Sequence, residues 1–503
     1  MQAGENATWA MAGAERRPER PGPYTGFDRM LIGGAWRRGR GDRSAVDSNP
    51  FTQEPLVEIP LADLRDVDDA CRAAESAYRH WSLARARDRI VVIERAASVI
   101  ERRKTEIVDW LVRESGSTRA KATLEWHLAH RALTLATQWL WLSEERALGG
   151  ECRARTARVR RRPIGVAGVI TPFNFPFSLT MRAVAPALAS GNAVVLKPAT
   201  DTPVTGGLIV AKVFEEAGLP EGLLNVVVGE GRDVGAALVE HPVPRILSFT
   251  GSTVVGRWIA QRAGRLVKRV RLELGNNTPF IVLDDADISL AVDAALAGKF
   301  LHQGQVSTAI NRILVDARRH DELVERFVER ASALRVGDPS DERTEIGPII
   351  NQARFEGIVQ KLEATIARGV MVALRTAASG LVLPPVVLAN VTRDTPAARE
   401  ELFGPVAPVL PFTSEEEAIR IASDAPFESS AVFAGDFERG VEIARRLDAR
   451  SVHVNDWPIH DDPRSVPGEE GPSSSRTLGG HWRIEDLTTM WCVQEPSTSR
   501  GAL

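Results

Sequence analysis

Hydrophobic positions follow a helical spacing in the first third of the chain. Within Asp66–Ser115 they recur every three to four residues, as in the series Val67, Ala70 and Ala74. This spacing places them on one face of a helix, so the segment is predicted to be mainly helical. The same spacing continues through Ala129–Leu142.

After Pro163, short apolar runs alternate with helical segments. The first predicted strands are Gly165–Thr171, Ala193–Lys197, Leu224–Val228 and Ile246–Thr250, with helices at Leu179–Leu188 and Gly206–Ala217. After Pro279 the alternation repeats with Phe280–Leu283, Leu290–Phe300, Arg312–Val315 and Asp321–Ala333. Such alternation is typical of a parallel sheet with crossover helices, and it predicts two α/β domains in tandem.

Two segments lack any hydrophobic period. The first 24 residues are rich in Gly, Pro, Ala and Arg and have no apolar stretch before a cleavage site. We therefore expect either a disordered extension there or a start codon assigned too early, with Met11 as another candidate start, rather than a secretory signal. Residues 461–479 are rich in Pro, Gly and Ser and are predicted to form a loop.

Composition narrows the class of protein. The chain has 503 residues, of which 44% are hydrophobic and 26% charged, with a net charge of −3. This balance gives no overall attraction to nucleic acid or to an anionic membrane, and no run of about 18 apolar residues is present to span one. The three cysteines, Cys71, Cys152 and Cys492, are too few and too far apart for a disulfide framework or a Cys-rich metal site. We expect a cytoplasmic location and no metal.

A glycine-rich turn is a candidate phosphate site. In Phe249–Gly256 (FTGSTVVG), Gly251 and Gly256 stand where a predicted strand turns into a helix. Glycines there let a phosphate approach backbone N–H groups at the positive end of the helix. Arg257 and Trp258 follow, which excludes the P-loop pattern. An ordinary turn also favours Gly and Ser, so the segment alone leaves both interpretations open.

Five further segments share their pattern with one enzyme family. They are TPFNFP at Thr171–Pro176, LKPATDTP at Leu196–Pro203, LELGNNTP at Leu272–Pro279, FLHQGQVSTAINR at Phe300–Arg312 and EELFGPV at Glu400–Val406. In this order and at these spacings they resemble the aldehyde dehydrogenase superfamily, over about residues 28 to 497. The FLHQGQ segment looks most like the benzaldehyde, vanillin and salicylaldehyde dehydrogenase branch.

The resemblance implies an aldehyde dehydrogenase-like α/β fold, with two Rossmann-like parallel-sheet domains and a small strand arm. Residues 25–148 and 164–274 would form the NAD(P)-binding domain, and residues 275–460 the catalytic domain. Residues 149–163 and 484–497 would form an oligomerisation arm, and residues 461–483 a substrate-entrance loop region. A homodimer or homotetramer is expected by the same analogy.

The resemblance also implies roles for matching residues. Asn174 corresponds to the amide that holds the oxyanion, Glu273 to the carboxylate that activates water, and Ser307 to the nucleophile. An amide donor suits developing negative charge, and a carboxylate can act as a general base. The residues that match the NAD or NADP site are Thr171, Pro172, Lys197, Thr200, Gly251, Ser252, Gly256, Glu401 and Phe403.

The nucleophile position departs from the family pattern. The family carries G-Q-x-C, whereas Gly304, Gln305 and Val306 are followed here by Ser307. A cysteine is a few per cent thiolate at neutral pH, but a serine hydroxyl is essentially never ionised and needs an adjacent base. We expect ordinary aldehyde oxidation to slow by several orders of magnitude, at about 1.4 kcal/mol of barrier for each tenfold.

Smaller departures concern specificity. Thr200 stands where NAD-preferring members often carry a glutamate, so the 2′-phosphate of NADP is not repelled. Asn276 replaces the second glycine of the usual ELGG and is expected to restrict Glu273. The late loop reads VPGEEGPSSSR instead of a Gly-rich run, which leaves the aldehyde preference open. His302 has no second metal ligand within sequence reach and is interpreted as structural.

Three functions remain open from the sequence. The first is an NAD(P)-dependent oxidoreductase that acts on an aromatic or otherwise bulky aldehyde. The second is a pseudoenzyme that keeps the fold and works as a partner or ligand-binding subunit. The third is a repurposed non-redox enzyme of secondary metabolism that uses Asn174 and Glu273. The retained pair Glu401 and Phe403 argues against complete loss of the cofactor site.

Overall fold

The computed structural model describes residues 22–138, 146–149, 155–425, 427, 429–449, 451–457, 474–475 and 482–496. Most of the predicted N-terminal extension lies outside these residues. Tyr24, which the sequence analysis placed in the extension, is instead packed against the first lobe. Its backbone N–H donates to Glu106 at 2.6 Å, its hydroxyl donates to Glu216 at 2.7 Å, and the Arg103 guanidinium lies 3.6 Å from its ring centroid. Tyr24 is therefore part of the folded first lobe.

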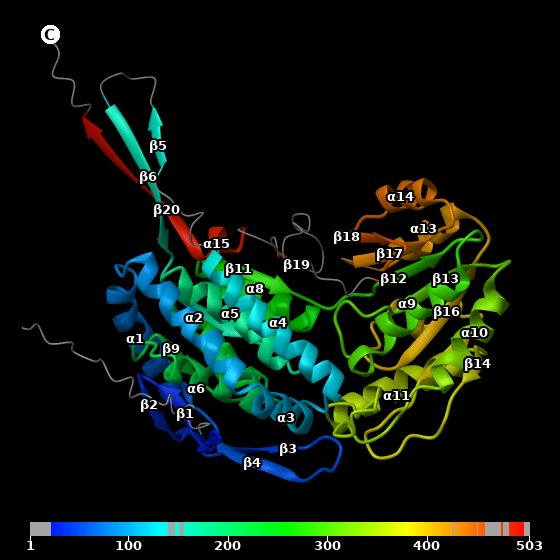
Figure 1. The fold of residues 1–503 in the computed structure, drawn as a ribbon, viewed down its shortest axis with the longest axis horizontal. Coiled ribbons are helices and arrows are strands. Elements are labelled where there is room, and N and C mark those ends of the chain that lie inside the picture. Colours follow the sequence, from blue (N-terminus) through cyan, green and yellow to red (C-terminus); the bar gives the residue numbers. More distant parts are fainter. Residues whose placement is uncertain are drawn as a thin grey trace, which may run out of the picture.

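A six-stranded sheet forms the centre of the first lobe, in the order β19-β11-β10-β7-β8-β9 (Figure 1). Its strands are β7 (Val166–Ile170), β8 (Ala193–Lys197), β9 (Leu224–Val226), β10 (Pro244–Thr250), β11 (Arg269–Glu273) and β19 (Ser474–Ser475). All neighbouring pairs are parallel except β11 with β19. β7 and β8 are almost entirely apolar and buried, as expected for parallel strands covered on both faces.

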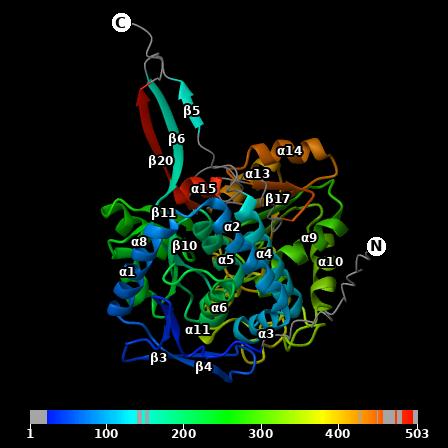
Figure 2. The same ribbon diagram turned by 60° about the vertical axis from the view of Figure 1, so that its left-hand side comes forward.

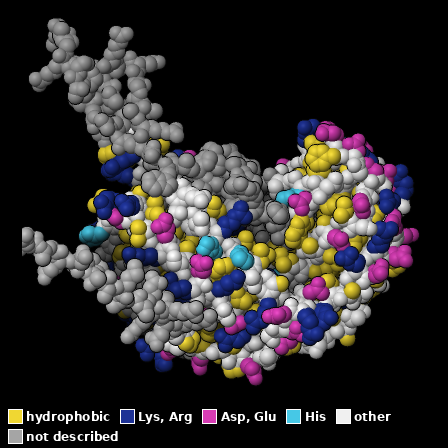
Figure 3. Space-filling view, viewed as in Figure 1, with side chains coloured by type: hydrophobic (Ala, Val, Ile, Leu, Met, Phe, Trp, Pro, Cys, Tyr) yellow, Lys and Arg dark blue, Asp and Glu magenta, His cyan; other side chains and the backbone are white. Residues whose placement is uncertain are grey.

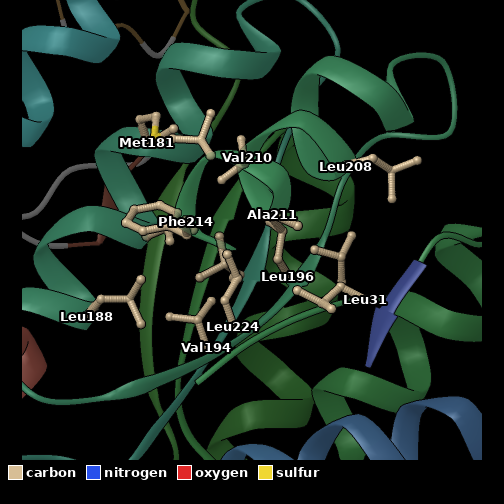
Figure 4. Packing of buried hydrophobic residues seen from close by; sticks show 14 of the residues in the cluster. Leu31, Met181, Leu188, Val194, Leu196, Leu208, Val210, Ala211, Phe214 and Leu224 are labelled. Atoms are coloured by element: carbon tan, nitrogen blue, oxygen red, sulfur yellow. The ribbon is translucent and has the colours of Figure 1, made fainter. Parts of the chain in front are cut away.

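Helices pack around this sheet and bury their apolar faces on it. They are α1 (Leu64–Trp81), α2 (Ala86–Arg102), α3 (Lys104–Ser115), α4 (Arg119–Gln138), α5 (Pro176–Ala189), α6 (Ile209–Glu216), α7 (Ala236–Glu240) and α8 (Thr253–Arg265), with π-helical turns η2 (Val204–Leu208) and η3 (Gly231–Gly235). Figure 4 shows the core between them, where Phe214 and Val210 of α6 and Met181 of α5 lie over Val194 and Leu196 of β8.

A seven-stranded sheet forms the second lobe, in the order β14-β15-β16-β13-β12-β17-β18. Its strands are β12 (Pro279–Val282), β13 (Arg312–Asp316), β14 (Met371–Leu374), β15 (Val386–Ala389), β16 (Val406–Phe412), β17 (Ser429–Phe433) and β18 (Ser451–Val454). Only β14 is antiparallel to its neighbour. The helices of this lobe are α9 (Ile288–Phe300), η4 (Leu301–Gly304), α10 (His320–Ser332), α11 (Gln352–Ile366), α12 (Pro396–Arg399), α13 (Glu415–Ser423) and α14 (Phe437–Arg445).

A separate antiparallel sheet projects from the first lobe, clear of both lobes in both views (Figures 1 and 2). It comprises β5 (Arg146–Gly149), β6 (Arg155–Pro163) and β20 (Thr488–Pro496), and α15 (Trp482–Leu487) leads into it. Trp491 of β20 is covered by the guanidiniums of Arg160 and Arg162, at 4.6 and 3.7 Å from its ring. Two hairpins complete the fold, β1 (Met30–Ile32) with β2 (Ala35–Arg37) and β3 (Ser44–Ser48) with β4 (Pro55–Pro60).

The predicted α/β class with two parallel-sheet domains is confirmed. β8 spans the predicted residues, whereas α5 begins at Pro176, three residues before the predicted start. Proline suits the first turn of a helix because its missing N–H is not needed there. The predicted helix Gly206–Ala217 begins instead as the π-helical turn η2.

On the face shown in Figure 3, Lys and Arg side chains are interspersed with Asp and Glu. Many of them form surface ion pairs, such as Arg326 with Glu322 at 2.8 Å. In the part of the chain that the structure describes, no helix is long and apolar enough to cross a membrane.

Candidate active site

Asn174 and the segment of Ser307 meet in the structure. Asn174 follows β7 and precedes α5, and only 5% of it is exposed. Its side-chain Nδ2 donates a hydrogen bond of 2.8 Å to the backbone carbonyl of Gln305, two residues before Ser307. The two predicted catalytic segments, which lie about 130 residues apart in sequence, are therefore joined by a direct hydrogen bond.

The backbone before Ser307 is unusually shaped. His302, Gln303 and Gly304 have consecutive positive φ angles of 49°, 57° and 73°. Such left-handed conformations are costly for residues other than glycine and occur preferentially at functional sites. The turn Val306–Ala309, closed by a 3.0 Å backbone hydrogen bond, then carries Ser307. The segment is thus held in one defined shape.

Apolar side chains surround this turn. Phe175, Val306 and Ala309 form a buried cluster, and Leu128, Leu179 and Leu301 pack against it. They come from α4, α5, η4 and the loops beside Asn174 and Ser307. The turn that carries the candidate nucleophile is therefore packed among apolar side chains.

Glu273 is held by two arginines that the sequence analysis missed. It ends β11, and its carboxylate forms an ion pair with Arg182 of α5 and another with Arg271 at 3.4 Å. The side chain of Glu273 is 16% exposed. Arg271 stands two residues before Glu273 on the same face of the strand, which was a usable signal. Arg182 had no such signal, because an arginine on a helix usually faces solvent.

Four predicted cofactor residues gather at the carboxyl ends of β7 and β8. Thr171 is buried and its N–H donates to the carbonyl of Lys197 at 3.2 Å, while Pro172 and Thr200 are half-buried. The buried Lys197 ammonium donates to the Pro198 carbonyl at 2.8 Å. Burial lowers the pKa of Lys197 to about 8, against the opposing effect of nearby Glu230 and Asp201. In open parallel sheets, ligands bind at this edge.

The glycine-rich turn lies between β10 and α8. Ser252 is exposed at the N-cap of α8 and accepts a 3.4 Å hydrogen bond from the Val255 N–H, and Gly251 is half-buried before it. A Cβ at Gly256 would lie 2.2 Å from the Leu274 side chain. The close packing of α8 on Leu274 therefore requires a glycine at position 256, whether or not a ligand is bound.

Glu401 is a buried carboxylate with spare hydrogen-bonding capacity. Its Oε1 has no hydrogen-bond partner within the described residues. Burial raises the pKa of Glu401 to about 7, while the N–H of Asn276 and the cations Lys361, Lys299 and Arg354 act in the opposite direction. A Cβ at Gly275 would lie 2.5 Å from Glu401 Oε2, so a larger residue there would displace this carboxylate. Asn276 thus contacts Glu401 through its backbone.

Phe403 follows Glu401 by two residues and has a left-handed conformation, with φ of 50°. Its ring meets that of Phe173 edge-to-face, with centroids 5.9 Å apart. A bulky residue with positive φ is a rare conformation that the surroundings must enforce. The pair of Glu401 and Phe403 is consequently presented in a fixed arrangement.

Lys299 is a second buried group that the sequence analysis missed. It is fully buried in α9, its ammonium has no hydrogen-bond partner among the described residues, and burial lowers its pKa to about 7. The carboxylate that favours its charged form is Glu401.

His302, interpreted as structural, is 1% exposed, and burial together with Lys121 lowers its pKa well below the usual value. No group of three or more metal-ligating side chains occurs in the described ranges.

A profile of the aldehyde dehydrogenase family matches residues 36–491. The chain belongs to the aldehyde dehydrogenase family. A vanillin dehydrogenase from Corynebacterium glutamicum is 43% identical over 471 residues, which cover 93% of this chain and 97% of that protein. The benzaldehyde dehydrogenase YfmT from Bacillus subtilis is 41% identical over 468 residues, which cover 93% and 96%.

A solved structure of another aldehyde dehydrogenase gives the same result. The crystal structure of an NAD-dependent benzaldehyde dehydrogenase from Corynebacterium glutamicum superimposes with a TM-score of 0.86 at 41% identity, covering 95% of this chain and 98% of that one. The predicted family and its vanillin and benzaldehyde branch are confirmed. Ser307 lies inside the matched range, which extends on both sides of it.

Proposed function

We propose that this aldehyde dehydrogenase-family protein binds NAD or NADP and an aromatic aldehyde, and that Ser307 makes its aldehyde oxidation orders of magnitude slower than that of a cysteine enzyme. The observation that carries the proposal is the hydrogen bond from Asn174 to Gln305, which sets an amide donor beside the turn of Ser307. Similarity to proteins named vanillin and benzaldehyde dehydrogenase supports the aromatic substrate.

The residues present fit a nicotinamide dinucleotide. Glu401 offers an unpartnered buried carboxylate oxygen to a ribose hydroxyl, and Phe403, two residues later, offers a fixed ring. Lys197 would hold the adenosine ribose, and Ser252 at the start of α8 would meet the pyrophosphate. Thr171, Pro172, Thr200 and Gly251 line the same edge of the sheet. The cofactor, when bound, supplies the hydride acceptor.

The protein's own groups explain why turnover would be slow. The Asn174 amide can stabilise negative charge on an aldehyde oxygen, and the apolar cluster excludes water from it. Ser307, however, needs a base before it can attack a carbonyl. Glu273 is a poor candidate, since Arg182 and Arg271 already occupy its carboxylate. The protein therefore keeps the Asn174 amide that can bind the oxyanion, but Ser307 has no base to activate it.

The same ion pairs favour a second candidate, a silent pseudoenzyme that keeps its ligand sites. A non-redox reaction through Asn174 and Glu273 would first require Glu273 to break its ion pairs with Arg182 and Arg271.

We further propose that residues 25–148 and 164–274 form the cofactor domain and residues 275–460 the catalytic domain. The sheet of β5, β6 and β20 would serve as the oligomerisation arm of a homodimer or homotetramer. A cytoplasmic location stays a prediction.

Isothermal titration calorimetry of the unchanged protein tests the binding part of this proposal. NAD or NADP should bind with a dissociation constant below about 1 mM, equivalent to about 4 kcal/mol. Benzaldehyde should then bind to the cofactor complex. Glu401→Ala should weaken cofactor binding in a variant that remains folded, as circular dichroism can verify. Failure of both dinucleotides to bind would overturn the oxidoreductase proposal.

A further inference from the structure

A fully buried ion pair lies behind the oxyanion amide. Lys121 and Glu125 stand one turn apart on α4, their side chains have no exposed surface, and their charged atoms are 2.5 Å apart. Neither residue belongs to the motifs that carry the family resemblance. Charges buried this deeply are costly, and an apolar pair of similar volume is often at least as stable. Stability alone therefore does not account for the pair.

The lysine end of the pair binds the backbone of Asn174. Its ammonium has three protons, and each has an acceptor: Ser117 Oγ at 2.9 Å, Glu125 Oε2 at 2.5 Å and the Asn174 carbonyl at 2.6 Å. The ammonium also lies 4.2 Å from the centroid of the Phe175 ring. The Lys121 ammonium thus holds the carbonyl of Asn174, and with it the peptide group between Asn174 and Phe175.

The glutamate end holds the start of α5. Glu125 Oε1 accepts hydrogen bonds from the N–H groups of Phe177 at 2.8 Å and Ser178 at 3.2 Å. The helix has no N-cap side chain of its own, since its N-cap residue is Phe175. A carboxylate at a helix N-terminus satisfies free N–H groups and favours the helix dipole. Glu125 therefore caps α5 from a neighbouring helix.

We infer that Lys121 and Glu125 are positioning residues that hold the Asn174 amide in its oxyanion-binding orientation. Asn174 lies between the two points that the pair fixes, its own carbonyl and the first turn of α5. Its side chain is then directed at the Gln305 carbonyl. The pair acts through Asn174 and not on the substrate. This inference rests on the proposed function, because it assigns Asn174 the oxyanion role.

The test uses the full-length Ser307→Cys protein, in which turnover is measurable under the proposed function. Lys121→Met/Glu125→Leu replaces the pair by apolar side chains and leaves no lone buried charge. Arg103→Met is the matched control, because Arg103 forms a mostly buried ion pair with Glu106 in the same lobe without contacting Asn174. Melting temperature, kcat, the two KM values and a crystal structure are measured for each protein.

We expect the double variant to fold, with kcat for benzaldehyde lowered about 10- to 100-fold and the cofactor KM within about twofold. Its crystal structure should show the Asn174 amide displaced from Gln305. Arg103→Met should lose melting temperature but keep kcat. A folded double variant with unchanged kcat and an undisplaced amide would overturn the inference. If Ser307→Cys itself is inactive, the proposed function fails, and the crystal structure alone still decides the positioning role.

Discussion

The Asn174 side-chain amide donates a 2.8 Å hydrogen bond to the carbonyl of Gln305, which lies two residues before Ser307. This bond joins the loop after β7 to the turn after η4, and so links the six-stranded and the seven-stranded lobe at the candidate site. One amide proton is used by this bond. The other is left for a developing oxyanion, which is the arrangement that oxyanion stabilisation requires.

The first prediction concerns this amide. In the Ser307→Cys background, Asn174→Ala should lower kcat about 100- to 1000-fold, the usual effect of removing one oxyanion donor. Cofactor affinity should be unchanged, as measured by calorimetry. Asn225→Ala provides the control, because Asn225 is also a buried amide bound to a backbone carbonyl, that of Gly222 at 2.7 Å. An equal loss of kcat in both variants would assign Asn174 a purely structural role.

The second prediction is a pH dependence of cofactor binding. Burial raises the pKa of Glu401 to about 7, so the carboxylate is ionised above that pH and neutral below it. An ionised carboxylate binds a hydroxyl more strongly than a neutral one. NAD affinity should therefore rise about three- to tenfold from pH 6 to pH 8.

Lys299 titrates in the same range and loses its charge as the pH rises, so it favours the ionised Glu401 carboxylate only at the lower pH values. Variants must therefore separate the two groups. Glu401→Gln should abolish the pH dependence, and Lys299→Met should shift it to higher pH because a stabilising cation is lost. Calorimetry at several pH values gives the result. An unaltered slope in Glu401→Gln would show that another group titrates.

A third prediction separates packing from phosphate binding at Gly256. Gly256→Ala should destabilise the protein by about 1–3 kcal/mol, because its Cβ would meet Leu274. If the added Cβ lowers cofactor affinity only by pushing α8 away from Leu274, then adding Leu274→Ala makes room for it and should restore that affinity. Thermal unfolding and calorimetry measure both effects. Affinity that stays low in the double variant would instead indicate that a phosphate needs the space.

A fourth prediction addresses the arginines on Glu273. In Ser307→Cys, Arg182→Leu frees part of the carboxylate for water, and kcat should rise about threefold through better general-base catalysis. Arg245→Leu is the control, since Arg245 is an exposed arginine on the neighbouring strand β10. Steady-state NADH production gives the rates. A fall in kcat of tenfold or more would mean that Arg182 orients Glu273 or binds the substrate.

Much of the fold could be predicted from sequence, because its strands are short apolar runs with clear turns between them. β8 was predicted at its observed bounds for this reason. Asn174, Glu273 and Ser307 came from motifs. The residues that hold them could not be predicted in this way. Arg182, which pairs with Glu273, and the Lys121–Glu125 pair, which binds Asn174 and α5, have the spacing of ordinary surface charges on helices. Only the packing of α4 and α5 shows that the Lys121–Glu125 pair is fully buried and that Arg182 is paired with Glu273.

The most direct test of the central claim is the ratio of kcat/KM for benzaldehyde between Ser307→Cys and the unchanged protein, measured as NAD(P)H production under identical conditions. The claim is that a working oxyanion site lacks only its nucleophile. We predict a ratio of at least about 1000, which corresponds to about 4 kcal/mol of barrier. A ratio near one, with the unchanged protein turning over aldehyde at an ordinary rate, would contradict the account.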